Sequence, residues 1–228
     1  MLSSLGWSQC DGCNYSFSYW SYPIGFFSPN QCTEIISNTF ECNQSDVQLL
    51  IDIINQNGID ESTSSIDINN EDGIFQPIEL GEQIWENGRL IRFNIFGNSS
   101  WEHFNYGVSI IPESISNLEK IIYLDIDHNH IESLPESFGE LSLLETLWYG
   151  DSDTITYIPE SIWELNSLKL LGVWNTSITE IPNKITDLTN LELLYFNENN
   201  ISEIPLEIWN LTRLKYIDLS SNQLTGEI

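Results

Sequence analysis

Short apolar alternations recur at a constant spacing along the second half of the chain. The segment LTRLKYIDLSSNQL starts at residue 211, and its counterparts start at residues 188, 165, 141 and 118, so successive copies are 23 or 24 residues apart. Each copy approximates L-x-x-L-x-x-L-x-L-x-x-N-x-L, usually followed by Ile-Pro and one further apolar position. The alternation predicts a short strand with one buried side. The constant period predicts a stack of repeated units.

An earlier copy, NGRLIRFNIFGN, keeps Leu90, Phe93, Ile95 and Asn98 in register, and the longer gap after it predicts a loop inserted after Asn98. These copies together resemble leucine-rich repeats over about residues 84–228. The resemblance implies an α/β fold. It would be a right-handed leucine-rich repeat solenoid with short parallel strands on the concave face and irregular, 3-10 or helical segments on the convex side. A capping helix is expected at its N-terminal end.

The residues after each strand predict how the chain turns. An Asn there can satisfy backbone groups that the turn leaves unpaired, so stacked copies form a ladder. The predicted ladder consists of Asn98, Asn129, Asn199 and Asn222, and Ser152 and Thr176 weaken it in two repeats. Proline then starts a return segment, buried by Ile115, Phe138, Ile162, Ile185 and Ile208. The next position forms a convex column that includes Trp163 and Trp209, and Trp85 fits the same register; we interpret these tryptophans as filling the outer arc.

The chain divides into three predicted parts: a Cys- and aromatic-rich segment (1–43), an N-terminal cap (44–83), and about six leucine-rich repeats (84–228), the last incomplete. The cap contains a predicted helix over about residues 45–57, followed by an acidic turn. Ser45 and Gln48 suggest a capping box, and Gly58 marks the stop. The apolar positions that would cover the first repeat are Val47, Leu50, Ile51 and Ile54.

All four cysteines, Cys10, Cys13, Cys32 and Cys42, lie in the first segment. This clustering favours two disulfides over a zinc site or free thiols, and disulfides indicate an extracellular or cell-surface protein. The N-terminus does not have the pattern of a signal peptide, so a cytoplasmic protein with reduced cysteines stays an alternative. No run of 18 apolar residues occurs, so direct membrane insertion of this segment is not expected.

The chain is strongly acidic, with 34 Asp and Glu against 7 Lys and Arg and a formal net charge of -27. This charge repels phosphate backbones, so a nucleic-acid partner is not expected. Because the charge is spread over the whole chain, it favours a role in solubility over the recruitment of cationic ligands.

The chain lacks the sequence motifs of common enzymes, so catalysis and cofactors are not expected. The loop at residues 68–79 partly matches a calcium-binding EF-hand, but Ile68 occupies the first ligand position, and an acidic surface turn is favoured. His128 and His130 could form a metal pair, but the repeat register sends them in different directions. No metal site is therefore predicted.

The strand positions between the buried residues predict a concave face that a ligand could contact. The candidate binding residues are Tyr123, Asp125, Trp148, Leu170, Trp174, Leu193, Tyr195 and Tyr216. The predicted acidic margin consists of Asp125, Asp127, Asp151, Glu198 and Asp218. Gly150 and Gly172 would leave room for a partner. The alternative interpretation is that the aromatic residues only pack against one another across the strands.

These features predict a non-enzymatic recognition module that binds a protein or a carbohydrate on its concave face. A structural spacer of a larger surface protein and a cytosolic regulator or effector are the alternatives. The ending LTGEI resembles extracellular plant-type repeats, whereas ISEIP and IESLP resemble intracellular and bacterial ones. The last copy stops half-way through a repeat, so we expect a fragment of a longer solenoid in which Ile217, Leu219 and Leu224 are half covered.

Overall fold

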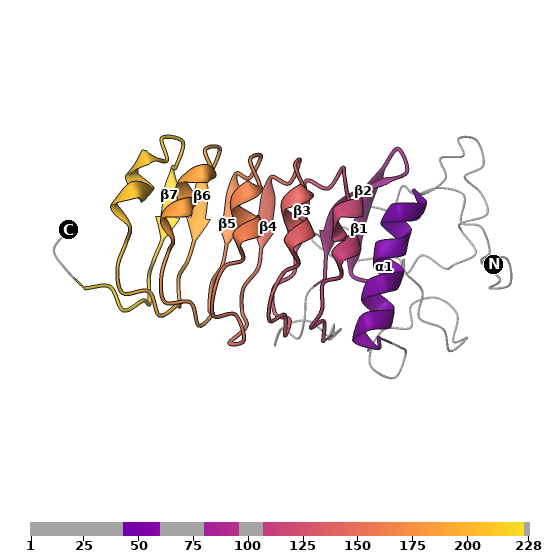
Figure 1. The fold of residues 1–228 in the computed structure, drawn as a ribbon, viewed down its shortest axis with the longest axis horizontal. Helices are drawn as coiled ribbons and strands as arrows, with labels where there is room; N and C mark the ends of the chain where they lie inside the picture. The colour runs from indigo at the N-terminus through magenta and orange to yellow at the C-terminus, as the bar shows by residue number, and fades with distance from the viewer. Residues whose placement is uncertain (1–42, 60–79, 96–106, 226–228) are drawn as a thin grey trace, which may run out of the picture.

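The fold is an elongated stack of repeated units with one helix across its N-terminal end (Figure 1). The computed structural model describes residues 43–59, 80–95 and 107–225. Helix α1 (Gln44–Asn57) comes first, and most of the units after it add one strand and one short 3-10 helix. This arrangement is the predicted leucine-rich repeat solenoid.

Seven strands form a single sheet in the order β1 to β7 along the stack. The strands are β1 (Glu82–Glu86), β2 (Arg89–Asn94), β3 (Tyr123–Asp125), β4 (Thr146–Trp148), β5 (Leu170–Gly172), β6 (Leu193–Tyr195) and β7 (Tyr216–Asp218). From β2 onward all neighbours are parallel, and each pairing joins equivalent positions of successive repeats. Side chains one repeat apart therefore form straight columns across the sheet.

Short 3-10 helices form the side of the stack opposite the sheet. They are η3 (Glu113–Asn117), η4 (Glu136–Glu140), η5 (Glu160–Glu164), η6 (Asn183–Asp187) and η7 (Leu206–Asn210). A proline precedes each one, with φ between -58 and -72°, which is the value that its ring imposes. The apolar residue at the centre of each helix is at most 1 % exposed, as predicted for Ile115 and its four equivalents.

One continuous apolar core lies between the sheet and these helices. It consists of columns of equivalent residues from successive repeats. The central strand residues Leu124, Leu147, Leu171 and Leu194 are at most 1 % exposed. Their equivalent in β7, Ile217, is only partly buried because no further described repeat covers it. Leu219 is also partly buried and Leu224 is 39 % exposed, in line with the half coverage expected at this end.

The first unit of the sheet is a hairpin, which the sequence pattern did not predict. Strand β1 pairs antiparallel with β2, and the chain turns through Asn87 and Gly88, both with positive φ. An Asn-Gly pair is the preferred sequence for this two-residue turn. Trp85 therefore lies in a strand, 6 % exposed, and donates a hydrogen bond to Gln83. Its placement in the convex column was wrong.

Helix α1 begins one residue earlier than predicted and uses a different N-cap. Asn43 caps it, accepting hydrogen bonds from the backbone N–H groups of Ser45 (2.9 Å) and Asp46 (3.3 Å), so the expected Ser45 capping box is wrong. Gly58, at φ 61°, ends the helix as predicted. The buried residues are Asp46, Leu49, Leu50 and Ile53, whereas Val47, Ile51 and Ile54 are only partly buried. The buried face is thus rotated from the predicted one.

Polar contacts explain that rotation. Asp46 is fully buried and forms a two-pronged ion pair with Arg89, and it also accepts a hydrogen bond of 2.8 Å from the backbone N–H of Leu90. At the other end of the helix, the Asn57 side chain accepts from the backbone N–H groups of Ser109 and Ile110. These contacts fix α1 against the hairpin and the first return segment.

Several predicted features lie outside the described residues: the four cysteines, the acidic loop at 68–79, and Asn98 with the inserted loop around it. The division of the chain into parts at residues 43 and 83 stays a prediction. Within residues 43–59, 80–95 and 107–225, no helix has the length and apolar character needed to cross a membrane.

Candidate functional site

Three columns of side chains project from the sheet on the side away from the core. The first column consists of Arg92, Tyr123, Thr146, Leu170, Leu193 and Tyr216. The second consists of Asn94, Asp125, Trp148, Gly172, Tyr195 and Asp218. The third follows the strand ends and consists of Asp127, Gly150, Trp174, Asn197 and Ser220. All eight candidate binding residues lie in these columns.

Three aromatic rings form a row over strands β4 to β7. Trp148 and Tyr195 have ring centroids 5.1 Å apart, and Tyr195 and Tyr216 have centroids 5.2 Å apart. We call Trp148, Tyr195 and Tyr216 the aromatic row. Tyr216 is 46 % exposed and the other two are half-buried, so part of each ring remains accessible. Leu170 and Leu193, half-buried in the first column, lie beside the row.

The two glycines of this face are covered by tryptophans. A Cβ on Gly172 would overlap the six-membered ring of Trp148, and a Cβ on Gly150 would lie 2.8 Å from Cδ1 of Trp174. The Trp148 ring therefore fills the space above Gly172, and the backbone and ring of Trp174 fill the space above Gly150. The expectation that Gly150 and Gly172 leave room for a partner was wrong, because this chain's own side chains fill the room.

Two carboxyl groups are buried under this face instead of forming part of an exposed margin. Asp125 and Asp127 are each 5 % exposed. Asp125 accepts from the Tyr123 hydroxyl (3.1 Å) and from the backbone N–H of Asp127 (3.3 Å). Asp127 accepts from the backbone N–H of Gly150 (2.5 Å) and from Nε1 of Trp174 (2.7 Å). Trp174 thus reaches across β4 and closes over Asp127.

Burial changes the acidity of this carboxyl pair. Loss of solvation raises the pKa of Asp125 to about 7, against the hydrogen bonds from Asp127 and Tyr123 that favour its ionised form. Loss of solvation and then the neighbouring charge of Asp125 raise the pKa of Asp127 well above its ordinary value. Both oxygens of Asp127 accept from N–H donors, whereas the Tyr123 hydroxyl facing Asp125 can also accept. We therefore place the proton that the pair holds near neutral pH on Asp125.

Charged groups also lie at both ends of the face. The guanidinium of Arg92 lies 4.2 Å from the centroid of the Tyr123 ring. Nε2 of His128 lies 3.2 Å from the Asp151 carboxylate, and the His128 ring contacts Trp174 edge-on at 5.5 Å. At the β7 end, hydrogen bonds from the side chain and then the backbone of Ser220 lower the pKa of Asp218.

The turns after the strands hold the face in register. The side-chain amide of Asn129 donates to the backbone carbonyls of Ile95 (2.6 Å), Ile126 and Asp127. Asn199 makes the equivalent bonds to Val173, Phe196 and Asn197, and Asn222 makes them to Phe196, Leu219 and Ser220. Thr176 bonds to Asn199, while Ser152 bonds to Thr154. Each Asn amide thus joins its own turn to the preceding repeat.

The described residues bring no metal-ligand cluster together. They contain no group of three or more His, Asp or Glu side chains arranged around a common point. His128 faces Asp151, whereas the backbone of His130 bonds to Val108.

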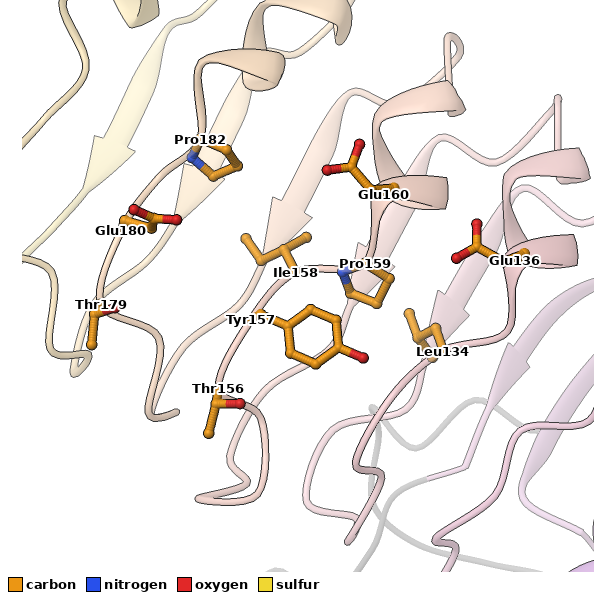
Figure 2. Close-up of a pocket in the computed structure, with 10 residues that line it drawn as sticks. All are labelled: Leu134, Glu136, Thr156, Tyr157, Ile158, Pro159, Glu160, Thr179, Glu180 and Pro182. Atoms are coloured by element: carbon orange, nitrogen blue, oxygen red, sulfur yellow. The ribbon is translucent and has the colours of Figure 1, made fainter.

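A pocket of about 320 Å³ lies away from the concave face, among the return segments that lead into η4, η5 and η6 (Figure 2). Tyr157, which is 56 % exposed, lies there beside Pro159, and Glu136 and Glu160 lie above it. The repeat pattern did not predict this pocket. One sequence feature marks its position: an aromatic residue precedes Ile-Pro only in the repeat that is 24 residues long.

Comparisons with known proteins agree with the geometry. The leucine-rich repeat family matches the chain over residues 120–141 and 166–224. A 58-residue segment is 38 % identical to the TMV resistance protein N of Nicotiana glutinosa. The segment makes up 25 % of this chain and 5 % of that protein. The chain therefore spans about a twentieth of this curated relative.

Solved structures support the same fold. A leucine-rich repeat protein of Leptospira interrogans superposes with a TM-score of 0.50 at 27 % identity, covering 53 % of this chain and 30 % of that one. A plant ice-binding protein superposes with a TM-score of 0.61 at 23 % identity, covering 81 % of this chain and 58 % of that one. The second likeness concerns the fold alone.

Proposed function

We propose that this chain, which is a leucine-rich repeat protein, is a non-enzymatic recognition module that binds a protein ligand on its concave face. The observation that carries the proposal is the aromatic row of Trp148, Tyr195 and Tyr216 on the sheet side away from the core. The continuous core lies on the opposite side of the sheet, so partly exposed rings here are not needed to close it. Aromatic residues in a desolvated centre with a polar surround are typical of binding hot spots.

The packing of the row also favours binding. Trp148 is fixed by Gly172 below it and by Tyr195 beside it, and Trp174 is fixed by its hydrogen bond to Asp127. Side chains that are ordered before association lose little conformational entropy when a partner binds. A rigid aromatic surface is therefore well suited to recognition.

The proposal is tested by matched substitutions on the two faces. Tyr195→Ala and Tyr216→Ala would together remove two rings of the row, while Trp209→Ala would remove a ring of η7 that is 66 % exposed on the convex side. We expect the concave pair of changes to abolish capture of a partner by the full chain, and the convex change to leave it intact. Circular dichroism would show that both variants are folded. Loss of capture with Trp209→Ala alone would contradict a concave site.

A structural spacer is the competing function, and the packing of the rings on one another is the observation that favours it. In that case, the paired Tyr substitutions would lower stability while leaving every interaction of the protein unchanged. A cross-linker placed at the exposed concave residue Ser220, compared with one at the exposed convex residue Asn210, separates the two functions directly. Only a recognition module gives a product that depends on the concave position.

An extracellular or cell-surface location is a further part of the proposal. It is supported by the clustering of Cys10, Cys13, Cys32 and Cys42, which is typical of a small disulfide-bonded segment. Mass spectrometry of the non-reduced protein from its natural source would measure the masses of the cysteine-containing peptides. Four free thiols would favour the cytosolic regulator instead.

A further inference from the structure

We propose that the partner of the concave face is a basic polypeptide segment whose Arg or Lys side chains lie against the aromatic row. The inference rests on the proposed function and names the chemistry of its ligand. It is carried by the distribution of charge around the row, by an internal cation–π contact on the same face, and by the order of residues in the second column.

Four of the seven cations of the chain form ion pairs with its own acids. All seven Lys and Arg residues lie in the described part of the chain. Four of them pair with acids: Arg89 with Asp46 and Lys184 with Glu160 away from the face, and Lys169 with Glu145 and Lys215 with Glu192 at the starts of strands, beside the first column. Among the described residues of the three columns, only Arg92 is a cation, and it lies two strands away from Trp148. The three columns over β4 to β7 therefore contain no cation, and the two lysines that border them, Lys169 and Lys215, are neutralised by their glutamate partners.

Acids lie at both ends of the row in the second column. From β3 to β7 that column reads Asp125, Trp148, Gly172, Tyr195, Asp218. Asp218 also accepts from the hydroxyl of Tyr216 at 3.4 Å, so this carboxylate touches the row directly. Asp125 is buried and holds the proton of its pair near neutral pH, so the charge that a partner over the rings meets is the Asp218 carboxylate, which favours a positive charge there.

The face already shows how it holds a guanidinium. Arg92 lies over the Tyr123 ring at 4.2 Å, close enough for attraction between the cation and the ring face. In the described part of the chain, no Lys or Arg lies over Trp148, Tyr195 or Tyr216 in the same way. A basic partner would supply to these three rings the contact that Arg92 supplies to Tyr123.

The dimensions fit a short extended segment. Trp148 and Asp218 are three strands apart, which corresponds to about 14 Å at the usual strand spacing. An extended chain covers that distance with about four residues. Because Trp148 and Trp174 fill the spaces above Gly172 and Gly150, the segment would lie on the rings and not between them.

Binding of labelled peptides to the full chain tests the inference by fluorescence anisotropy. The probes are three capped peptides of about eight residues, one alternating Arg and Gly, one alternating Glu and Gly, and one of Ser and Gly. We expect binding of the Arg peptide alone. Raising the salt from about 50 to about 300 mM should weaken that binding because screening reduces the charge attraction.

Matched variants locate the contact. Tyr195→Leu removes the ring face but keeps an apolar side chain, and we expect it to weaken binding about three- to fivefold. Tyr195→Phe keeps the ring and should bind as the natural protein does. Asp218→Asn should weaken binding about twofold or more, whereas Glu207→Gln, an exposed acid on η7, should have no effect.

The possible outcomes separate this inference from the proposed function. Arg-peptide binding that is insensitive to Tyr195→Leu and equally sensitive to Asp218→Asn and Glu207→Gln reflects diffuse attraction to the net charge and overturns the inference. Absence of Arg-peptide binding also overturns it. If a neutral peptide or a glycan binds instead and Tyr195→Leu abolishes its binding, the basic partner is wrong but the concave recognition face stands.

Discussion

Replacing Asp125 with asparagine tests the buried carboxyl pair under the concave face. The change keeps the shape of the side chain and one carbonyl oxygen for the backbone N–H of Asp127, while the new amide can donate to the Tyr123 oxygen. It removes only the ability to ionise. We therefore expect the variant to fold normally and to lose much of the pH dependence of its stability between about pH 5 and 8.

The sign follows from the direction of the pKa change. Burial raises the pKa of Asp125 from 3.8 to about 7, so the folded protein binds more protons than the unfolded chain between these values. The stability that this difference contributes is present in full below about pH 4 and is lost as the pH rises through about 7. Asp127 acts in the same direction, since its pKa is also raised.

The magnitude can be bounded from the same values. A difference of about three between the folded and unfolded pKa corresponds to about 4 kcal/mol in the free energy of unfolding. The side chain is only 5 % exposed, so screening by solvent is weak, but relaxation around a buried charge makes this value an upper limit. We expect a measured effect of about 1–3 kcal/mol.

Urea unfolding at about pH 5, 6.5 and 8 measures this effect. The natural protein should lose stability steadily across the series, and Asp125→Asn should lose less, so that the variant is the more stable protein at the highest pH. Glu132→Gln, which changes an exposed acid on a return segment, serves as the control and should follow the natural protein. Equal slopes for the natural protein and Asp125→Asn would refute a buried carboxyl that holds a proton near neutral pH.

Three further substitutions test the packing of the solenoid. Gly172→Ala should displace the Trp148 ring, costing about 1–3 kcal/mol in urea unfolding and raising the quenching of Trp fluorescence by acrylamide. Asn199→Ala should lower the free energy of unfolding by about 2–3 kcal/mol and Asn222→Ala by about 1 kcal/mol. The difference arises because Asn199 is buried between two repeats, whereas Asn222 is half-buried. Equal losses of unfolding free energy in the two variants would contradict this. Asp46→Ala should cost about 1–3 kcal/mol by removing one ion-pair partner of Arg89 and the acceptor of the buried backbone N–H of Leu90, and should increase hydrogen exchange in α1; unchanged exchange would argue against the ion pair as the anchor of the helix.

The repeat architecture could be predicted because its cause is local and periodic. A residue such as Phe138 or Ile185 occupies a position that the 23-residue period fixes, and the same pattern places every strand. The eight candidate binding residues reach the sheet face by the same alternation. Periodicity misled the interpretation of Trp85, because the Asn87–Gly88 turn signal competes with the repeat register and, in the structure, prevails.

The side-chain contacts on the concave face could not be predicted, because they depend on the orientation of each side chain. Trp174 and Asp127 are 47 residues apart, and their hydrogen bond depends on the indole crossing a glycine of the intervening strand. A pattern of columns identifies the neighbours but not the direction of the ring. The sequence therefore predicted an acidic margin at Asp125 and Asp127 where the structure has a buried pair.

The alternation of large and small residues determines what kind of contact this face can make. Each tryptophan occupies the space that a neighbouring glycine leaves, so no room remains above Gly150 or Gly172 for an inserted side chain. An apolar side chain that needs a cavity would have to displace Trp148 and lose its contact with Tyr195. A planar guanidinium or the stem of a lysine needs no cavity, because it can lie on a ring with its charge directed toward the carboxylate of Asp218. The same packing that stabilises the sheet therefore favours flat, cationic contacts over insertion of an apolar anchor.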